Sequence, residues 1–116
     1  MKKLMIGWTT FASQEDAEKI GDRLVMEGLA ACTQIDGPIR STYRWKGKLM
    51  HEAEYRLTVK FPKSHAADIS AFIQQHHPYD NPQWLACRAK EAAPAYVIWA
   101  LSQTYPDVSQ QENSLA

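Results

Sequence analysis

Apolar and polar residues alternate along residues 51–61 with a period of two, the spacing of a β-strand that buries one face. The bulky apolar members of the pattern are Tyr55, Leu57, Val59 and Phe61. The polar members between them include Glu54, Arg56, Thr58 and Lys60. Residues 29–45 are extended in character, and the tight-turn signal Lys46-Gly47 joins them to this strand. We therefore predict a long β-hairpin, with a bulge at Asp36-Gly37-Pro38.

Two other segments replace this alternation with helical spacing. The first helix follows Ser13, which can cap it, and ends before Gly28. Its apolar positions are Ala17, Ile20 and Leu24. The second helix begins at Ser64 and cannot continue through Pro78. Its inward positions are Ile69, Phe72 and Ile73.

The remaining elements are strands at residues 4–10 and 84–89 and a last helix that starts at Pro94. The resulting order, β-α-β-β-α-β plus a C-terminal helix, is that of a ferredoxin-like split βαβ sandwich of the α+β class. We predict one domain over residues 1–105, followed by a polar tail at 106–116.

The hairpin is too long for the helices of its own chain to cover. Thirteen-residue arms reach about 43 Å at 3.3 Å per residue, whereas a 14-residue helix covers about 21 Å. The overhang carries Tyr43, Trp45, Leu49 and Met50, which a monomer would leave exposed. We expect a homo-oligomer in which another copy covers them. A hairpin that coils back on itself is the alternative.

The hairpin register decides what this overhang displays. With a two-residue turn, Tyr43 and Trp45 share a face with Glu52 and Glu54 and form a polar, aromatic ligand surface. One extra loop residue would place them with the apolar set, as core or interface. The sequence alone leaves both registers open.

Composition narrows the classes of partner. Thirteen basic and thirteen acidic residues cancel among 116, which argues against nucleic-acid and membrane partners because both attract clustered positive charge. Apolar runs are shorter than the roughly 20 residues of a membrane span. The two cysteines, Cys32 and Cys87, form no CxxC pair and accompany no secretion signal, so we expect a cytoplasmic protein.

Candidate chemistry concentrates in residues 76–82, which place two imidazoles, a phenol and a carboxylate between two prolines. Such a stiff polar turn can hold metal ligands or a proton carrier. The alternative is a helix-ending loop whose histidines meet solvent. Adjacent residues at a helix end diverge by about 100°, so His76 and His77 do not easily chelate one ion.

Several motifs occur together in a specific order. They are Leu29-Ala30-Ala31-Cys32, Ser41-x-Tyr43-x-Trp45-x-Gly47-Lys48, Glu54, Lys60, His76-His77-Pro78-Tyr79-x-x-Pro82 and Tyr96-x-x-Trp99. In this order they resemble the CutA divalent-cation tolerance family, over roughly residues 4–104. The resemblance implies a ferredoxin-like homotrimer with hairpin strands paired between subunits. It also implies an architecture similar to PII-type signalling trimers and a role in the response to metal ions, with copper binding proposed.

Three departures from the family bear on copper. The family's proposed copper site uses a first-strand cysteine, the first histidine of the HHPY motif and an acid after the second proline. Here Gly7-Trp8-Thr9 contains no thiol and Gln83 replaces the acid, so only His76 remains as a candidate ligand for copper or another divalent cation. Phe61 also stands where a small hydroxyl residue is common, which narrows any cleft beside Lys60.

A second hypothesis is a PII-like module that binds a small anionic ligand between subunits. The residues that the resemblance implies for this cleft are Trp45, Glu54, Lys60, His77 and Tyr79. Glu54 and Lys60 are equally explained as members of an ion pair, across strands or between subunits. A hydrolase or transferase would need a nucleophile, but Cys32 lies in an apolar run that predicts a buried, unreactive thiol. We therefore expect no enzyme.

Overall fold

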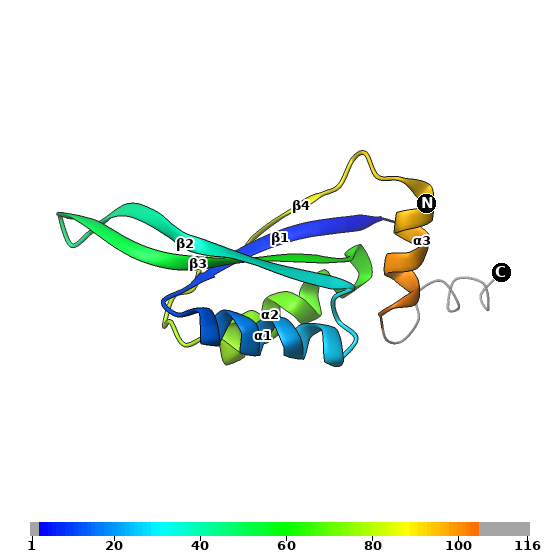
Figure 1. The fold of residues 1–116 in the computed structure, drawn as a ribbon, viewed down its shortest axis with the longest axis horizontal. Helices are drawn as coiled ribbons and strands as arrows, with labels where there is room; N and C mark the ends of the chain where they lie inside the picture. The colour runs from blue at the N-terminus through cyan, green and yellow to red at the C-terminus, as the bar shows by residue number, and fades with distance from the viewer. Residues whose placement is uncertain (1–2, 105–116) are drawn as a thin grey trace.

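The computed structural model describes residues 3–104 and has a mixed α/β fold. A four-stranded antiparallel sheet carries α1 and α2 on one face, and α3 lies at one end (Figure 1). The elements are β1 (Leu4–Phe11), α1 (Gln14–Met26), β2 (Cys32–Trp45), β3 (Lys48–Pro62), α2 (Ala66–His76), β4 (Leu85–Arg88) and α3 (Pro94–Ser102). The strands lie in the order β2-β3-β1-β4. The predicted tail at 106–116 and the domain boundary at residue 105 lie outside the described residues.

Local signals account for where the helices begin and end. The Ser13 hydroxyl accepts the backbone N–H of Asp16 at 3.1 Å, which caps α1 as predicted. A 3₁₀ turn at Lys63–His65 precedes α2, so the α-helix starts two residues later than the predicted Ser64. At the other end, His77 has extended dihedrals (φ −69°, ψ 138°) because Pro78 follows it.

The hydrophobic core lies between the sheet and the two helices α1 and α2. Its fully buried side chains include Phe11, Leu24, Leu57, Val59, Phe61, Ile69 and Ile73. The apolar half of the period-two pattern in β3 is therefore confirmed as the face turned toward the helices. The polar half of the pattern occupies the opposite face of the sheet.

The hairpin adopts the first of the two registers left open by the sequence. Trp45 pairs with Lys48, and Tyr43 pairs with Met50, so the turn contains two residues. Lys46 and Gly47 have φ values of 49° and 78°, which fit the type I′ turn typical of two-residue hairpins. Tyr43 and Trp45 consequently share a face with the acidic residues of β3. A register shift between Asp36 and Ile39 confirms the predicted bulge.

The hairpin overhangs the rest of the molecule, as its length predicted (Figure 1). Pairing of β1 with β3 ends at Phe11 and Tyr55, so residues 48–54 pair only with β2 among residues 3–104. Trp45 and Leu49 on this overhang are 56% and 67% exposed. Within the part of the chain that the structure describes, no helix is long and apolar enough to cross a membrane.

Candidate functional site

The imidazole of His77 is buried beside the end of β1. Its Nε2 lies 2.8 Å from the backbone oxygen of Thr10, and its Nδ1 accepts the backbone N–H of Tyr79 at 3.0 Å. A carbonyl only accepts and an amide N–H only donates, so the ring is neutral with its proton on Nε2. It also stacks on Phe11, with ring centroids 4.3 Å apart and 8° between planes. Both nitrogens of this histidine are therefore engaged.

Burial favours the neutral ring. It lowers the pKa of His77, while the bond to Thr10 and the carboxylates of Asp16 and Glu54 act in the opposite direction. Desolvation dominates because a buried imidazolium loses more hydration than these partners replace. His77 thus joins the loop after α2 to the end of β1 without carrying charge.

Tyr79 extends this network to the open face of the hairpin. Its hydroxyl donates to Glu54 Oε2 at 2.9 Å. Burial raises the pKa of Tyr79, because it disfavours the charged phenolate. The hydrogen bond to Glu54 raises the pKa further, because ionisation would place a negative phenolate beside the negative carboxylate. A second phenol, Tyr43, donates to Glu52 Oε1 at 3.1 Å on the same face. Two phenol–carboxylate pairs therefore lie side by side where the overhang begins.

Two of the predicted cleft residues lie far from this network. Lys60 Nζ lies 5.7 Å from the centroid of the Tyr96 ring, at the opposite end of the sheet from the hairpin turn. Lys60 is six residues along β3 from Glu54, a separation of about 20 Å. Trp45 lies opposite Lys48, which is six residues from Glu54 in the other direction. The single chain therefore brings together Glu54, His77 and Tyr79, but it does not bring Trp45 and Lys60 to them.

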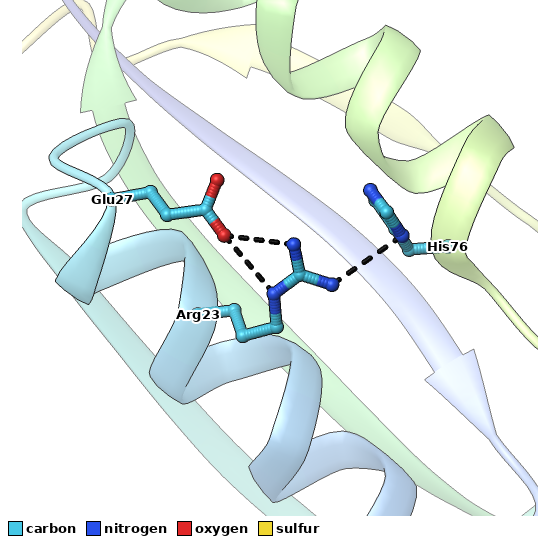
Figure 2. Close-up of polar contacts among 3 residues, drawn as sticks. All are labelled: Arg23, Glu27 and His76. Carbon is cyan, nitrogen blue, oxygen red and sulfur yellow. Dashed lines mark hydrogen bonds and ion pairs between the residues drawn. The ribbon is translucent and has the colours of Figure 1, made fainter.

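His76 points away from the network and contacts α1. Figure 2 shows Arg23 between Glu27 and His76. Arg23 Nη1 lies 3.4 Å from His76 Nδ1, while Nη2 and Nε lie 2.9 and 3.0 Å from Glu27 Oε2. The guanidinium also lies 4.8 Å from the centre of the Phe72 ring. The two adjacent histidines thus diverge, as expected, and belong to separate clusters.

The donor set around His76 is a poor fit to a divalent cation. Arg23 places a positive charge on the Nδ1 side of the ring, and no group of three or more His, Cys, Asp or Glu side chains gathers within residues 3–104. The contact with Arg23 uses Nδ1 as an acceptor, whereas a neutral imidazole that binds metal through Nε2 carries its proton on Nδ1. A metal ion at Nε2 would therefore break the contact with Arg23.

Sequence reasoning missed the partners of both histidines. Arg23 and Glu27 form a recognisable i,i+4 pair on α1, but nothing in the sequence connects Arg23 to a residue 53 positions away. The contact of His77 with Thr10 could not be predicted from residue types either, because the acceptor is a backbone oxygen, which every residue has. The expected burial of Cys32 is only partial, since this free thiol is half-buried and lines a cavity.

The fold and the site together define a class of protein. It is a small α/β sandwich whose hairpin extends beyond its helices and whose motif of two histidines, proline and tyrosine binds the start of that extension to the core. A family model for "CutA1 divalent ion tolerance protein" matches residues 5–103. This chain belongs to the CutA1 divalent ion tolerance family.

Individual relatives agree with this assignment. A probable divalent-cation tolerance protein cutA homolog of Encephalitozoon cuniculi is 33% identical over 114 residues, 98% of each chain. The divalent-cation tolerance protein CutA of Yersinia pestis is 31% identical over 90 residues, 78% of this chain and 76% of that one. The crystal structure of CutA1 from Oryza sativa has a TM-score of 0.86 at 27% identity, over 90% of this chain and 95% of that chain.

Proposed function

We propose that this protein acts in divalent-cation tolerance as a homotrimer of ferredoxin-like subunits, and that its ligand site forms between subunits. The overhanging hairpin is the observation that carries this proposal. Residues 48–54 of β3 and the outer edge of β2 expose backbone groups that another chain can pair with. The predicted cleft residues span about 40 Å along the hairpin within one protomer, so contact between copies would be needed to assemble them.

A second apolar region of the surface supports the same proposal. Leu85 on β4 and Ile98 and Trp99 on α3 are 63%, 60% and 46% exposed. Helix α3 lies at the opposite end of the sheet from the hairpin turn (Figure 1), and Leu85 pairs with Trp8 nearer the middle of the sheet. A ring of copies would allow the overhang of one subunit to cover the exposed end of the next, which removes apolar surface from water.

The assembly is tested by the mass in solution at micromolar concentration, measured by light scattering. We expect three copies for the natural chain and a smaller mass for Leu49→Glu, which places a charge on the overhang. Gln74→Glu is a control, because it introduces a glutamate at an exposed position of α2, and it should keep the natural mass. A natural chain that remains a single copy would refute the trimer.

Direct copper binding through His76 is a narrower candidate for the metal response. Its support is a half-exposed imidazole at the end of α2, in a family named for divalent ions. Because Arg23 opposes a cation at this ring, Arg23→Gln should strengthen Cu²⁺ binding in a calorimetric titration and His76→Ala should weaken it. His51→Ala, on the exposed hairpin, is the control. Equal affinities for all four proteins would eliminate His76 as a ligand.

The alternative is a PII-like module that binds a small anion near Lys60 and has no direct contact with metal. A screen of metabolites and nucleotides for a raised melting temperature tests it, because a ligand that prefers the folded state stabilises that state. Both ring nitrogens of His77 already have hydrogen-bond partners, so neither is free to transfer a proton to a substrate. This favours a binding role over a catalytic one, both for the metal proposal and for the anion proposal. The free cysteines Cys32 and Cys87 support a cytoplasmic location.

A further inference from the structure

The overhanging hairpin has two faces of different chemistry, because side chains alternate along its paired strands. One face, here called the aromatic face, carries most of the apolar residues of the overhang together with two acids: Tyr43, Trp45, Met50, Glu52 and Glu54. The opposite face, here called the basic face, carries no carboxylate, and all of its residues are exposed: Arg40, Thr42, Arg44, Leu49, His51 and Ala53.

The basic face stays accessible in the assembly proposed above. It continues the helix-covered side of β3, but the hairpin extends beyond α1 and α2 (Figure 1). A copy that pairs with the edge of β2 lies beside the ribbon, and a copy that covers Tyr43 and Trp45 lies on the aromatic face. Leu49, next to the turn, is the single bulky apolar side chain of the basic face. Charged and polar groups on this face therefore remain free to meet a ligand.

Two donors on the basic face converge on one nitrogen atom. Arg40 Nη2 lies 2.9 Å from His51 Nδ1, and the Thr42 hydroxyl oxygen lies 3.3 Å from the same nitrogen. A guanidinium can only donate, so Nδ1 is the acceptor and the imidazole carries its proton on Nε2. The strand register explains the cluster, because Thr42 pairs directly with His51 and Arg40 is its diagonal neighbour.

A neutral ring nitrogen is a weak partner for a guanidinium. Arg56, elsewhere on the hairpin, binds both oxygens of Asp36, at 3.1 and 2.7 Å. Arg40 and Arg44, in contrast, form no ion pair with any residue between 3 and 104. A charged oxygen accepts a hydrogen bond from a guanidinium more strongly than a neutral nitrogen does. An oxyanion can therefore replace the imidazole as the acceptor that Arg40 shares with its neighbour on the strand.

We propose that the basic face binds the phosphate group of a small molecule, held by the Arg40 guanidinium and the Thr42 hydroxyl. Arg44 supplies a second positive charge. The two arginines lie about 13 Å apart along β2, on either side of Thr42, so both long side chains can reach an anion above it. The guanidinium fork matches two phosphate oxygens, and the hydroxyl donates to a third. A phosphate monoester carries a charge of about −1.5 to −2 at pH 7, which two arginines balance.

This site is separate from the anion cleft considered near Lys60. His51 is nine residues from Lys60 along β3, a distance of about 30 Å. None of Arg40, Thr42 and Arg44 belongs to the set of cleft residues that the sequence predicted. The site is also unsuited to a metal ion, because two arginines repel a cation.

The test measures the binding of inorganic phosphate to the full chain by phosphorus NMR, with the ionic strength held constant by sodium chloride. Constant ionic strength matters because salt screens non-specific attraction. Arg40→Gln should weaken phosphate binding at least about fivefold, since it removes a charge-assisted hydrogen bond. Arg56→Gln is the matched control, because it makes the same change on the same hairpin, where the guanidinium binds Asp36. It should retain the natural affinity. His51→Ala removes the competing acceptor and should not weaken binding.

Undiminished affinity in Arg40→Gln, or an equal loss in Arg56→Gln, would overturn the proposal. A loss in Lys60→Gln without a loss in Arg40→Gln would also overturn it, because the phosphate would then bind in the other cleft. Light scattering on the same samples reports the assembly independently. A lower mass for Arg40→Gln, with no phosphate bound by the natural chain, would assign Arg40 to a contact with a neighbouring copy and reject the phosphate site. Failure of this site and failure of the proposed trimer therefore give different results.

Discussion

Replacing His77 by phenylalanine tests whether this residue stabilises the fold or serves as a free ligand. The substitution keeps a flat aromatic ring stacked on Phe11, but it removes both ring nitrogens. The backbone oxygen of Thr10 and the backbone N–H of Tyr79 then lose their partners, which lie 2.8 and 3.0 Å away in the natural chain. The expected effect is a loss of stability with little change in packing.

The magnitude follows from the two unsatisfied backbone groups. A buried donor or acceptor without a partner costs about 1–3 kcal/mol. The extra apolar character of phenylalanine offsets part of this cost, so we expect His77→Phe to lose about 2–4 kcal/mol of unfolding free energy. His76→Phe makes the same chemical change at a half-exposed position, where a single 3.4 Å contact is lost. It should cost less than about 1 kcal/mol.

The pH dependence gives an independent measure of the same residue. The pKa of folded His77 is lowered by burial, whereas the unfolded chain takes up the proton near the ordinary value of about 6.5. Above pH 6.5 both states are neutral and the stabilisation is complete. As the pH falls from 6.5 toward the folded pKa, the unfolded state binds more protons and stability declines, by at most about 1.4 kcal/mol per pH unit.

Urea unfolding at pH 7.5 and pH 5.5, at one fixed protein concentration, measures both effects. Fixed concentration matters because association adds to the apparent stability. The natural chain should lose more stability on acidification than His77→Phe, which lacks the titrating ring. An identical pH dependence in the two proteins, or a loss below about 0.5 kcal/mol for His77→Phe at pH 7.5, would refute the structural role assigned to this histidine.

Other substitutions probe the hairpin and the helix cap by the same unfolding assay. Tyr79→Phe removes the hydrogen bond to Glu54 and should cost about 1–2 kcal/mol; an unchanged midpoint would contradict this. Gly37→Ala should cost more than about 2 kcal/mol, since φ is 152° and a Cβ would lie 2.8 Å from a side-chain carbon of β3. Gly47→Ala, with nothing within 4 Å, should cost about 1–2 kcal/mol; equal losses would refute the steric argument. Ser13→Ala should cost about 1 kcal/mol, and no loss would disprove the cap.

Local sequence signals predicted much of the fold because they act over a few residues. The alternation along β3 placed Leu57, Val59 and Phe61 on one face, and each is fully buried. Lys46-Gly47 supplied the two residues of the turn, although only the structure distinguished this register from its alternative. The length of the hairpin relative to the helices predicted the overhang correctly. The alternation of apolar residues, the residues of the turn and the lengths of strands and helices can all be determined from neighbouring residues, without knowing which distant residues come into contact.

The candidate site was less accessible to sequence reasoning because its geometry depends on long-range contacts. Glu54 and Tyr79 are 25 residues apart, and Lys60 lies on the same strand as Glu54 but about 20 Å away. A set of polar residues in sequence order carries no information about such distances. The cavity lined by Cys32 was missed for a related reason, since its walls come from three separate elements that become neighbours only after folding.

The divergence of the two histidines has a cause that the sequence does contain. Pro78 disfavours a helical conformation at the residue before it, so α2 ends at His76 and His77 is extended. The first imidazole therefore stays on the helix and reaches Arg23 of α1, while the second turns into the core and reaches Thr10. A proline at this position separates the rings rather than presenting them as a pair. The two histidines of this motif are thus better explained as two attachments, of the end of α2 to α1 and of the following loop to β1, than as a chelating site within one chain.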